Sequence, residues 1–359
     1  MLLEPALQDQ TVGGATARLL SDIGEIGAAQ GVRELGEIWT RHTKGHPALL
    51  ARYGFENFKR TINFNYGQSA VGTFHHPLIR ALFAALVRSG RLPTGALARV
   101  NWNDAANIRW HVVVTQGRRF RRIGANTRRL LAYAICVGLL WQLAETADAV
   151  GCLDLDEPAF GHPMPVTLHG RLISQDQALT SFELNRMAEF IPLAKVRRVL
   201  EIGAGYGRLA YFFHKVFPQA QYVVADIAPA LAVSQNYLAA TLGESNVERF
   251  NPSPTFSAPF SFILPAQLKD VPDGFFDLVI NVNSMDEMPP QIVGEYLKTI
   301  ARVCRGHVYL SGWPAKRDES NGERIGVNEF PYDPAWRPLY SGPHRAPIGF
   351  VERMIAVGE

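Results

Sequence analysis

The spacing of apolar residues changes along the chain. Residues 15–60 and 76–90 carry apolar side chains every three or four positions, which is the spacing of an amphipathic helix. The run "LLAYAICVGLLWQLA" at 130–144 is apolar around most of a helical circumference, as in a buried helix. From residue 197 onward, short apolar runs alternate with helical segments. The pattern predicts a helical N-terminal domain over residues 1–160 and a different, mixed domain over residues 161–359.

Short apolar runs in the second half predict strands, and the segments between them predict helices. The strands are "RRVLEIG" (197–203), "QYVVADI" (221–227), "SFILPAQL" (261–268), "FDLVINVNS" (276–284) and "HVYLSGW" (307–313); the helices are 207–217, 229–243 and 289–304. Strands that alternate with helices form right-handed βαβ units and a mostly parallel, doubly wound sheet. The last run, at 349–357, follows a loop rich in proline and glycine, so we expect an antiparallel edge strand.

A segment rich in proline and glycine separates the two halves. It is "LDLDEPAFGHPMPVTLHG", at 153–170. A helix is predicted directly after it, at 174–191, with Ser174 as its N-cap. The fold class is therefore α/β, with a helical domain before a Rossmann-like domain.

Composition excludes several classes of protein. The 359 residues have a formal net charge of +3, which is too weak to indicate a nucleic-acid binder. Three cysteines without a paired spacing indicate a reducing compartment. The start of the chain lacks the basic region of a signal peptide, and the run at 130–144 is short for a membrane span. We expect a cytoplasmic protein that acts on a small molecule, with no membrane and no nucleic acid as partner.

The stretch "LEIGAGYGR" at 200–208 follows a predicted strand and opens a predicted helix. Glycine has no Cβ and tolerates a positive φ, so such a turn lets the backbone approach a ligand closely. Ligands of doubly wound sheets bind at the carboxyl ends of the strands. Asp226 ends the next strand, 23 residues after Gly203, where a carboxylate can accept hydrogen bonds from both hydroxyls of a ribose.

The glycine spacing and its charges favour a cationic cofactor. A dinucleotide site prefers G-x-G-x-x-G, but here the position of the third glycine is Arg208. Glu201 stands two residues before the first glycine, where a carboxylate suits a positively charged ligand better than a pyrophosphate. S-adenosylmethionine carries an ammonium and a sulfonium, so it is preferred, and an NAD-dependent oxidoreductase stays open as the alternative.

Four motifs in this order carry a family resemblance. "VLEIGAGYGR", "YVVADI", "FDLVINVNSMDEM" and "HVYLSG" resemble the successive motifs of class I S-adenosylmethionine-dependent methyltransferases over residues 170–359. Within that superfamily, "ISQDQALTSFELN" and "INVNSMDEMPPQIVGEYL" resemble the bacterial family of sugar O-methyltransferases. The resemblance implies a Rossmann-like methyltransferase domain that binds S-adenosyl-L-methionine.

The resemblance also implies roles for individual residues. The methionine end of the cofactor would be lined by the glycine turn, the ribose by Asp226 and the adenine by Ile227. The backbone or side chains after the third strand would approach the adenine edge, and the residues leaving the fourth strand would border both methionine and acceptor. The full implied set is Glu201, Gly203, Ala204, Gly205, Gly207, Asp226, Ile227, Ala266, Gln267, Asn281, Asn283 and Ser284.

A sugar hydroxyl is a poor nucleophile and needs a general base. Glu287 and Asp286 follow the fourth strand, where a base would sit, although acids before a helix can also serve its dipole. Histidines in loops are further candidates for the base, and polar or aromatic side chains are candidates for the acceptor. These residues are His75 and His76 for the base, and Asn65, Tyr66, Gln175 and His169 for the acceptor; capping or loop packing is the alternative for each.

Some sugar methyltransferases hold a divalent ion such as magnesium. Asp286 and Glu287 could contribute, but a third ligand is not evident, so no metal ligand is assigned. We predict O-methylation of a sugar hydroxyl on a nucleotide sugar, a glycoside or a glycosylated natural product. We expect the N-terminal domain to cover the acceptor and to contribute to a homodimer. A phenol, carboxylate or amine acceptor stays open, as does a binding protein without turnover.

Overall fold

The structure is a computed structural model of the chain. It describes residues 13–30, 47–48, 50–60, 112–116, 119–123, 137–138, 140–163, 166–168, 171–315, 317–319, 322–346 and 349–358. The chain forms two compact units. The first consists of Met1–Leu20 and Gly45–Phe182, and the second of Ser21–Lys44 and Glu183–Glu359. The predicted division at 160/161 stays a prediction.

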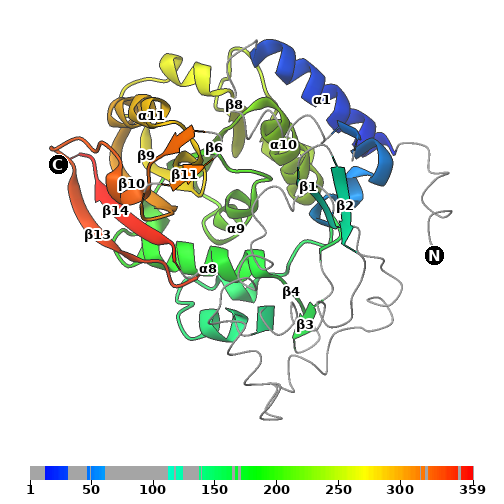
Figure 1. The fold of residues 1–359 in the computed structure, drawn as a ribbon, viewed down its shortest axis with the longest axis horizontal. Coiled ribbons are helices and arrows are strands. Elements are labelled where there is room, and N and C mark those ends of the chain that lie inside the picture. Colours follow the sequence, from blue (N-terminus) through cyan, green and yellow to red (C-terminus); the bar gives the residue numbers. More distant parts are fainter. Residues whose placement is uncertain are drawn as a thin grey trace. The chain divides into compact units, whose positions relative to one another are not determined.

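The second unit contains an eight-stranded sheet in the order β13-β14-β10-β9-β5-β6-β8-β7 (Figure 1). Its strands are β5 (Arg198–Ile202), β6 (Gln221–Ala225), β7 (Val247–Glu248), β8 (Phe260–Ile263), β9 (Phe276–Val282), β10 (Cys304–Gly312), β13 (Arg337–Pro343) and β14 (Val351–Ala356). The pairs among β10, β9, β5, β6, β8 and β7 are all parallel. The strand order reverses between β5 and β9, so the predicted doubly wound, Rossmann-like sheet is confirmed.

The antiparallel edge is also confirmed, and it contains two strands. β14 pairs antiparallel with β10, and β13 pairs antiparallel with β14 on its outer side. The sequence predicted only β14, because the segment 337–343 contains two prolines and a glycine and was assigned to a loop. Proline and glycine are tolerated in an edge strand, where half of the backbone hydrogen-bonding groups face away from the sheet. The run at 261–268 is a second correction, because β8 ends at Ile263 and Pro265–Asp270 forms the 3-10 helix η7.

Helices cover both faces of this sheet. α11 (Pro290–Val303) packs its apolar side, with Val293, Leu297 and Ile300, against one face in a single buried cluster. On the opposite face, Phe213 of α9 (Arg208–Val216) packs against Tyr222 of β6 at a ring distance of 5.4 Å. α10 (Ala228–Leu242) is buried along most of its length. Strands covered on both faces are hydrophobic throughout, which is why β5, β6 and β9 read as continuous apolar runs.

The predicted helix at 174–191 is α8 (Gln175–Ala188). Ser174 caps it as predicted, since its Oγ accepts a hydrogen bond from the Gln177 N–H at 3.0 Å. The part of α8 in the second unit carries polar and charged side chains with partners beside the buried apolar Leu184 and Met187. Glu183 accepts two hydrogen bonds of 2.8 Å from Arg208, the first residue of α9. Arg186 donates to Glu352 of β14 at 2.8 Å.

A short N-terminal segment also belongs to the second unit. The last ten residues of α1 (Gly14–Gln30) start at Ser21, where this unit begins. Asp22 Oδ2 accepts hydrogen bonds from Gln235 at 2.9 Å, Asn236 at 2.6 Å and Arg249 at 2.9 Å. Gln30 Oε1 accepts a hydrogen bond of 2.6 Å from the Ala228 N–H, the first of α10. α1 therefore supplies a cap to α10 that α10's own preceding residues do not.

The first unit is not purely helical, which corrects the prediction for residues 1–160. Val112–Gln116 (β1) and Arg119–Ile123 (β2) form an antiparallel pair. β3 (Val166–Leu168) and β4 (Arg171–Ile173) form another, just after the predicted boundary. Arginine-rich strands such as β2 have no helical or alternating apolar pattern, so their pairing could not be recognised from spacing.

The first unit also contains a buried polar cluster. Lys59 donates a hydrogen bond of 2.6 Å to Glu157, and Glu157 accepts another of 2.6 Å from Ser174.

Breaking the Arg208–Glu183 pair on one side should destabilise the protein strongly. Replacing Arg208 with methionine leaves the buried Glu183 carboxylate without the guanidinium charge, so we expect a loss of about 3–5 kcal/mol in the free energy of unfolding. The double variant R208M/E183M removes both charges and should lose clearly less than the single variant. Urea unfolding of the two variants checks this. As a control, Asp273→Ala at an exposed pair should cost less than about 1 kcal/mol, and equal losses in R208M and R208M/E183M would contradict the prediction.

Candidate active site

The carboxyl ends of four neighbouring strands form one edge of the sheet in the second unit. In spatial order they are β10, β9, β5 and β6. The residues that follow them are Trp313, Asn283, Gly203 and Asp226. Neighbouring strands lie about 4.8 Å apart, so these four positions fall within a span of about 15 Å. This edge contains the topological switch point, which is where doubly wound sheets bind their ligands.

The glycine turn after β5 has a backbone that other residues rarely adopt. Gly203, Gly205 and Gly207 have φ values of +74°, +61° and +87°. A Cβ on Gly203 would lie 2.0 Å from Ser284 Oγ, so the turn and the end of β9 touch at this point. A Cβ on Gly207 would lie 3.2 Å from Leu238, because α9 and α10 pack closely there. At Gly203, glycine is therefore needed both because φ is positive and because no space remains for a Cβ.

Asp226 joins the end of β6 to the glycine turn. Its Oδ2 accepts a hydrogen bond from the Gly205 N–H at 3.0 Å, and its Oδ1 accepts one from the Ile227 N–H at 2.8 Å. Each carboxylate oxygen can accept a second hydrogen bond, so the group retains capacity for two donors such as ribose hydroxyls. Burial raises the pKa of Asp226 to about 7, while the two backbone hydrogen bonds act in the opposite direction.

Glu201 lies inside the protein rather than at an open mouth. It is 3% exposed, and the Tyr222 hydroxyl donates a hydrogen bond of 2.8 Å to its Oε2. Burial raises the pKa of Glu201 to about 7, which the Tyr222 hydrogen bond and the charge of Arg208 partly offset. Its predicted contact with the methionine end of a cofactor stays a prediction.

The end of β9 combines an anchored side chain with a strained backbone position. Asn281 donates to the Ile202 carbonyl at 2.7 Å and accepts from the Met285 N–H at 3.2 Å, so its amide links β5 to the next turn. Asn283 has a φ of +52°, which is uncommon outside glycine. Its Oδ1 is buried without a hydrogen-bond partner among the described residues. Strain and an unsatisfied acceptor at a strand end are typical of a ligand site.

The segment after β8 is held by its own side chain. Gln267 accepts a hydrogen bond from the Leu264 N–H at 2.7 Å, and its amide donates to the carbonyls of Asn251 and Pro252 at 2.9 and 3.1 Å. Gln267 thus fixes the loop, and the neighbouring Ala266 is exposed. Their approach to an adenine stays a prediction, with the Gln267 side chain already engaged by the backbone.

Asp286 and Glu287 lie in the 3-10 turn η8 (Met285–Glu287), between β9 and α11. No acidic residue stands in the first turn of α11, which begins only at Pro290, so serving its dipole is not their evident role. Asp286 is 2% exposed, and its Oδ2 accepts a hydrogen bond from the Trp313 N–H at 2.9 Å. Glu287 is half-buried, and its carbonyl accepts a hydrogen bond from Arg324.

The other predicted site residues lie in the first unit or outside the described residues, and their roles stay predictions. Gln175 starts α8 in the first unit and is 2% exposed. His75, His76, Asn65, Tyr66 and His169 lie outside the described residues. Within the described ranges, no group of three or more His, Cys, Asp or Glu side chains could hold a metal ion. Magnesium therefore stays an open alternative from the sequence, with no ligand assigned.

Sequence reasoning missed two residues at this edge. Gln30 bonds to the start of α10, two residues after Asp226. Trp313 follows β10 and bonds through its backbone to Asp286. The position of Trp313 directly after an apolar run was a usable signal, because residues at strand ends face the ligand crevice. Gln30 gave no such signal, since it lies 198 positions from its partner.

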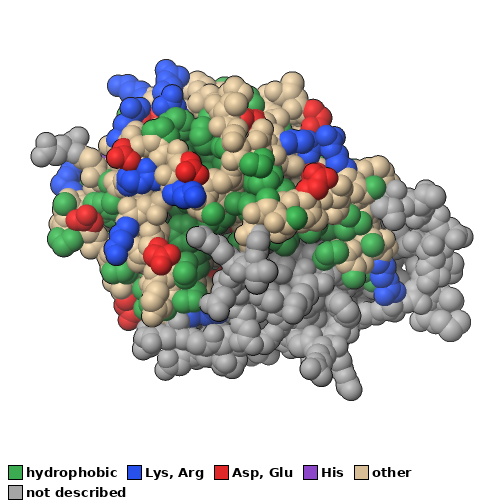
Figure 2. Space-filling model, turned by 90° about the horizontal axis from the view of Figure 1, so that it is seen from above, with side chains coloured by type: hydrophobic (Ala, Val, Ile, Leu, Met, Phe, Trp, Pro, Cys, Tyr) green, Lys and Arg blue, Asp and Glu red, His purple; other side chains and the backbone are tan. Residues whose placement is uncertain are grey.

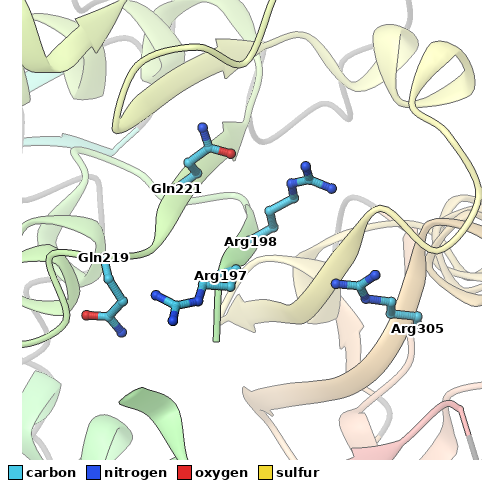
Figure 3. A pocket seen from close by; sticks show the side chains of 5 residues that line it. All are labelled: Arg197, Arg198, Gln219, Gln221 and Arg305. Carbon is cyan, nitrogen blue, oxygen red and sulfur yellow. The ribbon is translucent and has the colours of Figure 1, made fainter. Parts of the chain in front are cut away.

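A separate hollow of about 570 Å³ lies at the opposite, amino ends of the strands (Figure 3). It is lined by Arg197, Arg198, Arg305, Gln219 and Gln221. Asp277 binds Arg305 at 2.6 Å and accepts the backbone N–H groups of Arg197 and Arg198. The guanidinium of Arg198 lies over the Phe275 ring at 4.2 Å. The side chains of Arg198 and Arg305 have structural partners here, and the hollow does not lie at the ligand-binding end of the sheet.

The surface seen in Figure 2 carries basic and acidic side chains interspersed, with apolar groups between them. The coloured part of this face shows no broad field of one sign of the kind that steers nucleic acids. No helix in the described ranges combines the length and apolar character that crossing a bilayer requires.

No model of a protein family matches the sequence, and neither does any curated protein. Among solved structures, 616 chains match. A candidate sarcosine dimethylglycine methyltransferase from Galdieria sulphuraria is 19% identical, with 41% of this chain and 51% of that chain covered and a TM-score of 0.33. Magnesium protoporphyrin IX methyltransferase from Synechocystis PCC 6803, with bound SAM, is 16% identical, with 50% and 78% covered and a TM-score of 0.36.

The mitomycin 7-O-methyltransferase is 16% identical, with 50% of this chain and 56% of that chain covered and a TM-score of 0.35. This chain therefore spans only about half the length of the Galdieria and mitomycin proteins.

Gly203→Ala should destabilise the protein through both φ and space. A positive φ costs a non-glycine residue roughly 1–2 kcal/mol, and the overlap with Ser284 adds about 1–3 kcal/mol. Gly151→Ala is a matched control, since Gly151 has a φ of +76° but leaves 3.4 Å to the nearest atom. Chemical unfolding should show a larger loss in the free energy of unfolding for G203A than for G151A. The double variant G203A/S284G should recover part of that loss. Equal losses for G203A and G151A would show that the contact with Ser284 does not matter.

The contribution of Asp226 to stability should fall as pH rises from about 4 to about 7. In this window the folded protein keeps the Asp226 proton, since the folded pKa is about 7, whereas the unfolded chain has lost it. The stabilising contribution is complete below the unfolded pKa and lost as pH rises through the folded one. Glu201 acts with the same sign. Asp226→Asn should therefore flatten the pH dependence of urea unfolding by up to about 1.4 kcal/mol per pH unit; parallel curves for variant and parent would refute the assignment.

Proposed function

We propose that this protein is an S-adenosylmethionine-dependent O-methyltransferase that acts on a sugar hydroxyl. The observation that supports it best is Asp226, whose carboxylate is held at the end of β6 by two backbone N–H groups and retains two acceptor positions. That arrangement suits the two hydroxyls of an adenosine ribose. The glycine turn beside it gives a ligand close access to the backbone.

The surroundings of α9 favour S-adenosylmethionine over a dinucleotide. Arg208 occupies the position of the third dinucleotide glycine, and its guanidinium is engaged by Glu183 with two hydrogen bonds. A bulky, paired side chain at the start of α9 leaves less room for the pyrophosphate that such a helix terminus would bind. S-adenosylmethionine has no phosphate, so it needs no such opening.

The residues present fit the cofactor at both ends. Asp226 would accept the ribose hydroxyls, Ile227 would pack on the adenine, and Gly203 with Asn283 and Ser284 would border the methionine. Asn283 Oδ1, buried and without a partner among the described residues, is an acceptor suited to an ammonium. S-adenosylmethionine, when bound, supplies an electrophilic methyl group for in-line displacement. The protein then mainly aligns the acceptor and removes its proton.

We infer that Glu287 is the general base and that Asp286 positions the chain beside it. Asp286 is almost fully buried and engaged with the Trp313 N–H. Glu287 is partly accessible at the carboxyl end of β9 and can meet a hydroxyl from outside. A phenol acceptor would need less base assistance than a sugar, and it is the second candidate. The homodimer and the cover formed by the N-terminal residues belong to the same proposal.

Calorimetric titration tests the cofactor. S-adenosylhomocysteine should bind and NADH should not, and Asp226→Ala should weaken the binding of S-adenosylhomocysteine at least about tenfold by removing the acceptor of two hydrogen bonds. Asp273→Ala, an exposed carboxylate that pairs with Arg302, is the control and should leave binding unchanged. Binding of NADH without S-adenosylhomocysteine would overturn the proposed function.

A methyl-transfer screen with labelled cofactor tests the acceptor and the base. Nucleotide sugars and glycosides should be methylated, and Glu287→Gln should lower kcat by about 100-fold or more because general-base assistance contributes that much. The screen is run with and without EDTA and magnesium, which also addresses metal dependence. Methylation of phenols with little effect of Glu287→Gln would favour the second candidate instead.

A further inference from the structure

An aromatic pair lies at the carboxyl end of β10, beyond the residues assigned so far. Trp313 directly follows the strand and is 38% exposed. Its ring centroid lies 4.6 Å from that of Phe350, which precedes β14, with an angle of 38° between the planes. Among the described residues, the exposed large apolar side chains are Leu143, Ile292 and Trp313. Trp313 is therefore the aromatic ring that this part of the chain presents most openly.

The backbone of Trp313 is fixed on both sides. Its N–H donates to Asp286 Oδ2 at 2.9 Å, and its carbonyl accepts from the Val327 N–H at 2.7 Å. Gly312 is required before it, because a Cβ there would lie 2.8 Å from Asp286 Cγ. Phe350, directly before β14, supports the indole ring. The ring is thus held in place before any ligand arrives, which lowers the entropic cost of binding to it.

The position of the pair relates it to the proposed cofactor site. β10 is separated from β5 by β9 alone. Two strand spacings amount to about 10 Å, so Trp313 lies about that far along the edge from the Gly203 turn. A six-membered ring placed on Trp313 would span much of this distance and present one of its hydroxyls toward β9. Asp286 and Glu287 lie at the same strand end.

We propose that Trp313, supported by Phe350, is the platform on which the acceptor's ring lies. The acceptor class is then a neutral ring with one flat apolar face that bears a hydroxyl at its edge. A pyranoside and a phenol both have this chemistry. An anionic ring is disfavoured, since the face of an indole is electron-rich and attracts positive edges. This inference rests on the proposed function, and it narrows the substrate of the same site.

Variants of the pair test the proposal by kinetics and binding. Trp313→Ala should raise the KM for the acceptor by about 10- to 100-fold, the amount that stacking on an aromatic ring commonly supplies, and should change kcat less. Trp313→Phe should retain most of the affinity. Phe217→Ala is the matched control: Phe217 is also partly exposed and packs on another ring, Phe213, at 5.3 Å, but it follows α9 at the opposite end of the sheet. Thermal unfolding confirms that each variant is folded.

A second measurement does not need turnover. Saturation-transfer NMR with methyl glucopyranoside and with phenol, in the presence of S-adenosylhomocysteine, should show ring binding that W313A loses and F217A keeps. The ligand that binds more strongly shows whether the acceptor ring is that of a pyranoside or of a phenol. Unchanged ring binding or unchanged KM in W313A would overturn the platform. Failure of S-adenosylhomocysteine to bind the parent protein would instead overturn the proposed function. The effect of W313A on ring binding is a separate measurement, so the two failures can be told apart.

Discussion

Everything at the carboxyl edge of the sheet depends on a close approach between three backbone segments. Asp226 binds the Gly205 N–H and the Ile227 N–H, and so ties the end of β6 to the turn after β5. Gly203 touches Ser284, and so ties the same turn to the end of β9. The first contact uses both oxygens of the Asp226 carboxyl group, and the second needs the absence of a Cβ at Gly203. The shape of the crevice follows from these two constraints.

Charged residues support this edge from behind. Arg208 begins α9, where a positive charge opposes the helix dipole, and Glu183 of α8 compensates it with two hydrogen bonds. Glu352 of β14 accepts a hydrogen bond of 2.8 Å from Arg186 of α8 and one of 2.7 Å from the Tyr309 hydroxyl of β10. Paired polar and charged groups therefore lie here beside the buried apolar residues Leu184 and Met187 of α8. Such pairs fix geometry more than they add stability, which suits a surface that must hold a turn in one conformation.

Sequence reasoning recovered the parts of the fold that local patterns encode. The central strands are buried on both faces and read as apolar runs, and the glycines and Asp226 stand at strand ends where their roles follow from position. It missed β13, whose prolines resemble a loop, and β2, whose arginines hide its pairing. It also did not predict that the Gln267 side chain would bond to the backbone of its own loop, or that Glu201 would accept a hydrogen bond from Tyr222. Those outcomes depend on long-range contacts, which no spacing in the sequence records.

The hydrogen bonds from α1 have a practical consequence for dissecting the chain. Gln30 satisfies the first N–H of α10, and Asp22 gathers three donors from α10 and the segment after it. The unit that holds the glycine turn is thus assembled from two stretches of sequence that are more than a hundred residues apart. A fragment cut at the proline-rich segment would carry every strand of the sheet and still lack these acceptors. Expression of the sheet domain alone would call for grafting Ser21–Gln30 back, rather than for a simple truncation.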